Sequence, residues 1–235
     1  MKDTFSEYPQ FSMGTELSPP GERILVFDKL MDLVYPSILC ECTNMYFAGV
    51  QKLDLWNAGF ETTKLAVPNW NLIPVWGKID EGTFFYMLSR GQFPVNQQLR
   101  NIKNLEYVYL RDTWHDTMGH VPYLFNKDYT DMMILFGLAY QLADSDSIRR
   151  ALGRLYWAIV EFGMLDEGKE IKPLGAGVMS SKDELILAVS NSNNTHREFD
   201  LLEICSWDYD PYGVQDRHYV VPSIRFVSNQ IKKLM

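Results

Sequence analysis

Cysteine is scarce in this sequence, and it contains no long apolar run. The three cysteines, Cys40, Cys42 and Cys205, are odd in number and lack zinc-like spacing, so reduced thiols fit them better than a disulfide framework. No apolar stretch approaches the roughly 20 residues that a membrane-spanning helix requires. Residues 1–20 also lack the basic and then apolar layout of a signal peptide. We therefore expect a cytoplasmic protein with no membrane partner.

Positive charge is also in short supply. The chain has 22 lysine and arginine residues against 30 aspartate and glutamate residues, which gives a formal net charge of -8. This balance leaves no excess of positive charge to neutralise phosphates, so nucleic acid is not an expected partner. Hydrophobic residues make up 46% of the chain and charged residues 22%, as in ordinary globular proteins. Small molecules are the better candidates for ligands.

The order of apolar and polar residues predicts a mainly α-helical protein with small β elements. Residues 1–21 end in Pro19-Pro20-Gly21 and form an irregular lead-in, whereas residues 22–235 show no repeat or linker that would divide them. The absence of a terminal coiled-coil pattern favours a monomer or a dimer. Apolar spacing predicts helices over 22–35, 37–50, 80–88, 130–142 and 147–165, extended pieces within 65–75, and a strand at 185–189.

Two of the four histidines, His115 and His120, lie five residues apart. In a straight α-helix five residues advance about 500°, which leaves the two side chains about 140° apart around the axis. A shared metal ion would therefore require the helix to end between them. Gly119 suits a left-handed helix end, and Pro122 disfavours helix at the residue before it. The alternative is an ordinary pair, with one histidine capping the helix and the other exposed.

A carboxylate in an apolar setting supplies a third candidate ligand. Glu161 is the only side chain between Leu155 and Leu165 that is charged near neutral pH, and its helical neighbours three and four residues away are apolar. Burying an unpaired carboxylate costs several kcal/mol, so Glu161 needs a cation or strong donors. A metal ion meets that need, and so does a buried ion pair with Arg154 or Arg111.

Together the three residues resemble the facial set of two histidines and one carboxylate that binds ferrous iron and leaves positions open for other ligands. The same set can hold a catalytic zinc ion with a water molecule. The ligand types alone do not choose between an iron oxygenase and a zinc hydrolase.

Four groups of short motifs stand out in the sequence: Phe93-Pro94-Val95, His115-Asp116 with Gly119-His120-Val121-Pro122, Leu155-Tyr156-Trp157 with Val160-Glu161-Phe162-Gly163, and Gly175-Ala176-Gly177 with Ser180-Ser181. In these motifs the chain resembles the pterin-dependent aromatic amino acid hydroxylases, most closely the short bacterial phenylalanine hydroxylases. The resemblance is strongest over residues 74–181 and weaker to the C-terminus. Residues 22–235 would then form one catalytic domain.

The resemblance implies a role for each matching residue. It makes His115, His120 and Glu161 the iron ligands, with Tyr156 beside them in the catalytic centre. The implied amino acid site contains Arg100, Asp112, Trp157, Phe162 and Ser180, with Arg100 and Ser180 holding the substrate carboxylate. The implied pterin site contains Gly77, Ile79, Phe84 and Asp116, with Phe84 stacking on the flat ring. Without the resemblance, Phe84, Tyr156, Trp157 and Phe162 are equally well explained as core aromatics, and Arg100 and Asp116 as surface residues.

The implied reaction is hydroxylation of an aromatic amino acid, with Fe(II), a tetrahydropterin and dioxygen as cosubstrate. One departure bears on the substrate. Where the family usually has a Glu-Pro pair before the aspartate, this chain has Leu110-Arg111, which changes the floor of the pocket. Phenylalanine is the expected substrate. Tyrosine, tryptophan or another aromatic substrate of the same fold, and a non-catalytic protein that binds the amino acid or the pterin, remain alternatives.

Overall fold

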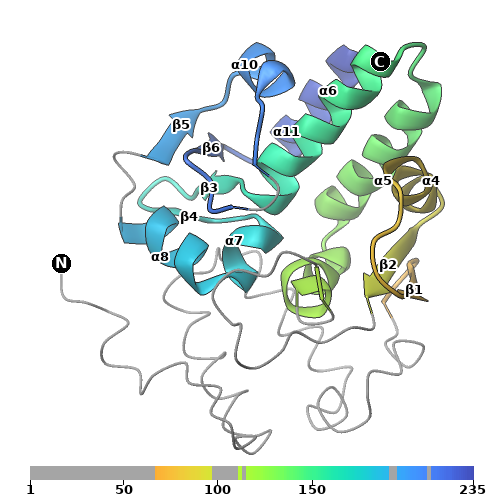
Figure 1. Cartoon of the computed structure of the whole chain (residues 1–235), viewed down its shortest axis with the longest axis horizontal. Helices are drawn as coiled ribbons and strands as arrows, with labels where there is room; N and C mark the ends of the chain where they lie inside the picture. Colours follow the sequence, from red (N-terminus) through yellow and green to blue (C-terminus); the bar gives the residue numbers. More distant parts are fainter. Residues whose placement is uncertain (1–66, 97–110, 113–114, 191–194, 211–212) are drawn as a thin grey trace, which may run out of the picture.

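The computed structural model describes residues 67–96, 111–112, 115–190, 195–210 and 213–235 (Figure 1). The predicted boundary at residue 21, the helices predicted over 22–35 and 37–50, and Arg100 lie outside these residues. Within them, none of the helices has both the length and the apolar character of a membrane span.

The described part of the chain is mainly helical, as predicted. The α-helices are α4 (Glu81–Ser89), α5 (Lys127–Leu142), α6 (Asp146–Tyr156), α7 (Ala176–Ser180), α8 (Lys182–Ser190), α10 (Leu201–Ser206) and α11 (Ile224–Ile231). Two π-helices, η2 (His115–His120) and η4 (Trp157–Glu161), and two 3₁₀ helices, η3 (Val121–Phe125) and η5 (Lys232–Leu234), complete the helical elements. Helix α5 packs against both α6 and α11, and in Figure 1 the four-stranded sheet lies to the left of these helices, with α7 below them.

The β structure consists of two small sheets. Strands β1 (Asn71–Val75) and β2 (Gln92–Asn96) pair in parallel, with α4 as the connection between them. The second sheet has the order β4-β3-β6-β5, from β3 (Met164–Asp166), β4 (Ile171–Pro173), β5 (His196–Glu198) and β6 (His218–Val221). Strand β3 runs antiparallel to β4 and parallel to β6. The extended conformation predicted within 65–75 is thus confirmed for β1.

Two predicted elements differ from the structure. The helix predicted over 147–165 is α6 followed by the π-helix η4, after which the chain enters β3. The strand predicted at 185–189 is wrong, because these residues lie within α8. Glu184, Leu185 and Ala188 are its buried positions, which is helical spacing. A short apolar run does not by itself distinguish a buried strand from a buried helix.

The helix start predicted at residue 80 is confirmed. Asp80 caps α4 by accepting a hydrogen bond from the Thr83 backbone N–H at 2.9 Å. The following turns of α4 pack against α5, where the Phe85 ring stacks on Tyr140 at 4.5 Å. This pairing fixes α4, and with it Phe84, against the rest of the core.

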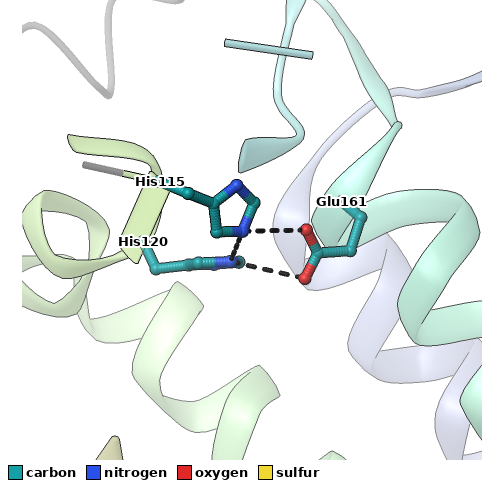
Figure 2. A group of neighbouring side chains, drawn as sticks. All are labelled: His115, His120 and Glu161. Atoms are coloured by element: carbon teal, nitrogen blue, oxygen red, sulfur yellow. Dashed lines mark hydrogen bonds and ion pairs between the residues drawn. The ribbon is translucent and has the colours of Figure 1, made fainter. Parts of the chain in front are cut away.

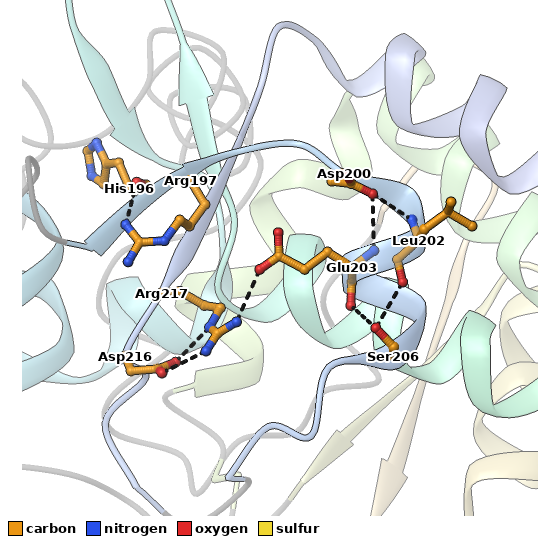
Figure 3. A network of polar contacts seen from close by, with 8 residues as sticks. All are labelled: His196, Arg197, Asp200, Leu202, Glu203, Ser206, Asp216 and Arg217. Atoms are coloured by element: carbon orange, nitrogen blue, oxygen red, sulfur yellow. Dashed lines mark hydrogen bonds and ion pairs between the residues drawn. The ribbon is translucent and has the colours of Figure 1, made fainter.

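The C-terminal segments are tied together by polar contacts (Figure 3). Asp200 caps α10 through the Leu202 and Glu203 backbone N–H groups, and Arg217 pairs with Asp216 and Glu203. Deeper in the protein, the buried Glu184 carboxyl group on α8 lies 2.7 Å from His218 Nε2 on β6. It also accepts the backbone N–H of Gln215, at 3.1 Å from each carboxyl oxygen. Glu184 therefore joins α8 to the last strand.

The contact between α4 and α5 generates a stability prediction. A Cβ atom added at Gly137 would lie 2.5 Å from the Phe85 carbonyl oxygen and would also meet the Ser89 backbone nitrogen. Gly137→Ala should therefore lower the free energy of unfolding by about 1–3 kcal/mol, as overpacking does. Urea unfolding would measure this loss. The control is Leu142→Ala, at an exposed position of the same helix, and equal losses in both variants would contradict a close backbone contact at Gly137.

Candidate metal centre

Three potential metal ligands meet in the interior of the protein. The Nε2 atoms of His115 and His120 lie 3.1 Å apart. Glu161 places Oε2 at 3.3 Å from His115 Nε2 and Oε1 at 3.3 Å from His120 Nε2. The three side chains point toward one another in Figure 2, and their ligand atoms all lie within 4.8 Å. Each residue is at most 5% exposed, so the three form a buried cluster.

The histidines converge by a route that differs from the expected one. Both lie in the π-helix η2, whose i→i+5 hydrogen-bond pattern brings residues five apart to the same side. The prediction that an α-helix ends at a left-handed Gly119 is therefore wrong: Gly119 is not among the described glycines with positive φ. Instead Gly119 allows close packing, since a Cβ atom there would lie 2.6 Å from Ala176 Cβ on α7.

The donor set fits a divalent cation. Burial lowers the pKa of His115 to about 4, although the nearby Glu161 carboxylate acts to raise it. This imidazole is therefore neutral near pH 7 and can ligate a metal. Burial alone would raise the pKa of Glu161, but Arg111, His120 and His115 together hold it well below its usual range. Two imidazole nitrogens and one ionised carboxylate match the facial set that binds ferrous iron.

Further side chains orient the two imidazoles. His115 Nδ1 lies 2.7 Å from the Ser180 hydroxyl, and the Asp112 carboxylate accepts the backbone N–H of His115 at 3.0 Å. His120 Nδ1 lies 3.3 Å from the Tyr129 hydroxyl. Hydrogen bonds to the second ring nitrogen fix the tautomer and the direction of a ligating histidine. Ser180, expected at the substrate carboxylate, is thus in contact with a candidate ligand.

Arg111 adds a cation to this cluster. Its Nη2 atom lies 2.9 Å from Glu161 Oε1, and its side chain is 37% exposed. The ion pair considered as an alternative to a metal is therefore present, and it involves the same carboxylate as the candidate metal site. Arg154, the other arginine considered, instead donates to the Cys205 carbonyl at 2.9 Å.

The cluster opens into a cavity of about 430 Å³. Aromatic and apolar side chains form much of its wall, as is usual for small-molecule sites. Among the predicted site residues other than the candidate ligands, those that line this cavity are Gly77, Ile79, Phe84, Asp116, Tyr156, Trp157, Phe162 and Ser180. Asp112 contacts the His115 backbone but is not part of the cavity lining, and Arg100 is outside the described residues.

Comparison with known proteins identifies the family. Residues 25–235 match the family described as biopterin-dependent aromatic amino acid hydroxylase. The chain belongs to this family. It is 35% identical over 184 residues to phenylalanine-4-hydroxylase from Mesorhizobium japonicum, covering 76% of this chain and 67% of that protein. It is 32% identical over 161 residues to the Chromobacterium violaceum phenylalanine-4-hydroxylase, covering 68% and 54%. The alignments thus span about half to two thirds of these hydroxylases.

Solved hydroxylase structures have the same fold. Phenylalanine hydroxylase from C. violaceum with bound iron(III) and oxidised 7,8-dihydrobiopterin superposes with a TM-score of 0.72 at 27% identity, covering 85% of this chain and 73% of that one. The Legionella pneumophila phenylalanine hydroxylase gives a TM-score of 0.77 at 21% identity, over 90% and 93% of the two chains. The second match bears on the fold alone. The family and the mainly α-helical fold expected from the motifs are therefore confirmed.

Two polar groups in the hydroxylase cavity have no partner among the described residues. The Tyr156 hydroxyl and the Trp157 indole N–H are buried and form no hydrogen bond there. Buried polar atoms rarely stay unpaired in a native protein. Because both residues line the cavity, these two atoms are suited to meet a ligand or its water.

Two contributors to the site were not predicted from the sequence. Tyr129 lies on α5 nine residues after His120, and no local pattern relates its hydroxyl to that imidazole. Tyr209 lies outside the matching motifs, yet its ring stacks on Trp157 at 4.6 Å with an interplanar angle of 16° and lines the cavity. Both contacts depend on how distant segments pack, which the sequence pattern does not report.

Asp116 generates a prediction for pH dependence. Burial raises its pKa to about 8, although the Asn96 backbone N–H and the Arg111 charge act to lower it. The unfolded chain loses this proton near pH 3.8 and the folded protein only near 8. The metal-free protein should therefore lose stability as the pH rises from about 4 to about 8, by about 1.4 kcal/mol per pH unit, and the loss should level off above pH 8.

The comparison of Asp116→Asn with the unchanged protein tests this assignment. The free energy of unfolding in urea would be measured at pH 7 and pH 9 after chelation of metal. The variant should lack the part of the decrease that Asp116 causes. The same decrease in both proteins would show that another group is responsible.

Proposed function

We propose that the chain hydroxylates the ring of an aromatic amino acid, most directly phenylalanine, with dioxygen, a tetrahydropterin and Fe(II) held by His115, His120 and Glu161. The observation that carries this proposal is the buried triad at the base of a ligand-sized cavity, in a member of the hydroxylase family. Curated relatives are phenylalanine-4-hydroxylases, which makes phenylalanine the first substrate to test.

In this proposal the protein supplies ligands and geometry. His115 and His120 would each present one imidazole nitrogen and Glu161 a carboxylate oxygen, a ligand set that leaves positions on the metal open for other ligands. When bound, ferrous iron and the reduced pterin supply the activation of dioxygen. The buried setting of the three ligands limits access of bulk water to the reacting atoms.

The pterin is assigned to the wall that contains Gly77, Ile79, Phe84 and Asp116. Phe84 is held edge-on by Tyr156 at 5.2 Å, with an interplanar angle of 81°, which fixes the orientation of its ring. Gly77 has φ of +73°, and a Cβ atom there would meet nothing within 4 Å, so the backbone is open at this edge of the cavity. A flat heterocycle can therefore approach both a fixed aromatic ring and exposed backbone groups.

The amino acid is assigned to the wall formed by Trp157, Phe162 and Ser180. Arg100 and Ser180 would bind its carboxylate, and Asp112 would support Arg100 and His115. Ser180 adjoins His115 at 2.7 Å, so a carboxylate at this serine would place the ring close to the metal ligands. Arg111 lies in the same cavity. Because this charge changes the floor of the pocket, oxygenation of tyrosine, tryptophan or another aromatic substrate is the second candidate function. Cytoplasmic location and a monomer or dimer remain predictions.

Turnover with defined components tests the proposal. The protein would be loaded anaerobically with Fe(II) and mixed with a tetrahydropterin, dioxygen and separately phenylalanine, tyrosine or tryptophan, with products identified by mass. We expect one added oxygen atom on phenylalanine. His115→Ala and Glu161→Ala should lose at least about 99% of the product, because each removes one of three ligands.

The matched control is His196→Ala, which removes a histidine on β5 that lies against the Ala188 carbonyl, away from the cavity. This variant should keep most of the activity. Hydrolytic activity of the zinc-loaded protein, with no hydroxylated product from Fe(II) and pterin, would refute the oxygenase. Tight binding of amino acid and pterin without any product would favour a binding protein instead.

A further inference from the structure

Arg111 lies against the carboxylate that is proposed to bind the metal. Its Nη2 atom is 2.9 Å from Glu161 Oε1, and His115 Nε2 is 3.3 Å from the other oxygen, Oε2. The two oxygens of Glu161 therefore have different surroundings. Each oxygen lies 3.3 Å from the Nε2 atom of one candidate ligand, His120 for Oε1 and His115 for Oε2, but only Oε1 is also paired with a permanent cation.

The position of Arg111 is fixed from two sides. Its backbone carbonyl accepts a hydrogen bond from Asn96 Nδ2 at 2.8 Å. Its guanidinium lies over the Trp157 ring, with Cζ 5.4 Å from the ring centroid, and Trp157 in turn stacks on Tyr209. A cation above an aromatic face that also pairs with a carboxylate is held by both attractions. Arg111 is thus a built part of the site.

We propose that Arg111 is a positioning residue that restricts Glu161 to ligation through Oε2 and weakens the binding of highly charged metal ions. The inference rests on the proposed metal role of the triad. Because the Arg111 charge is paired with Oε1, Oε2 is the oxygen that Glu161 would offer to the metal. The fixed positive charge also repels the metal.

The repulsion depends on the charge of the metal ion. Coulomb energy scales with the product of the two charges, so a nearby arginine destabilises Fe(III) more than Fe(II). The expected consequence is a site that favours the ferrous state, which is the form needed for the proposed reaction. A merely structural ion pair, by contrast, would affect folding without changing the preference between the two oxidation states.

The experiment compares the Arg111→Met and Arg111→Lys variants with the unchanged protein. Methionine keeps an apolar stem without charge, and lysine keeps the charge. Co(II) affinity would be measured by titration, and the Fe(III)/Fe(II) midpoint potential by spectroelectrochemistry. Arg111→Met should bind Co(II) at least about tenfold more tightly and have a lower midpoint potential. Arg111→Lys should remain close to the unchanged protein in both measurements.

Arg90→Met is the matched control, because Arg90 lies over the Tyr86 ring with Cζ at 5.7 Å but is exposed and outside the cavity. It should change neither quantity. Thermal unfolding with and without Co(II) guards against misfolding: Arg111→Met should be less stable without metal and gain a larger rise in Tm when Co(II) is added.

The two proposals fail in different ways. If the unchanged protein does not bind Co(II), or binds it as well after His115→Ala, the metal site and this inference are both refuted. If it binds Co(II) through the triad, but Arg111→Met binds it equally or more weakly at an unchanged potential, only the role of Arg111 is refuted.

Discussion

The burial of Glu161 is the constraint around which the site is built. Its carboxylate is 1% exposed and lies among apolar residues, where an ionised group is stable only if cations or strong donors surround it. Two π-helices supply these surroundings: Glu161 is the last residue of η4, and both histidines lie on η2 with their side chains toward the carboxylate. Arg111 completes the surroundings from the cavity side. The π-helical turns of η2 and η4, and the close packing of α7 against η2 at Gly119, bring these groups to the buried carboxylate.

Much of the site could be predicted because its strongest signals are local. Glu161 stands out as a charged residue among apolar neighbours, and the close spacing of His115 and His120 marks them as a pair. The start of α4 was predictable for the same reason, since the capping Asp80 accepts its hydrogen bond from Thr83, only three residues away. The family motifs then related these segments to one another, and the comparison with known hydroxylases confirmed the family.

The errors and omissions have a common physical origin. In a regular α-helix, His115 and His120 would point apart unless the helix ended at Gly119, whereas the π-helix η2 brings residues five apart to the same side without ending. The apolar run at 185–189 carries no period that separates a strand from a buried helix, and burial against other elements decided for α8. The contacts of Tyr129 and Tyr209 with the site arise from packing between distant segments.

Residues 213–235 contain none of the proposed ligands or pocket residues, yet the site depends on them. Glu184, completely buried on the helix that follows Ser180, has its partners at Gln215 and His218. Without that segment a buried carboxyl group would be left unsatisfied, at a cost of several kcal/mol. A shortened chain that ended before residue 213 would keep every proposed ligand and still lose the support of α8. The shortest functional form of this protein therefore cannot be set by its motifs alone and must extend to its last strand.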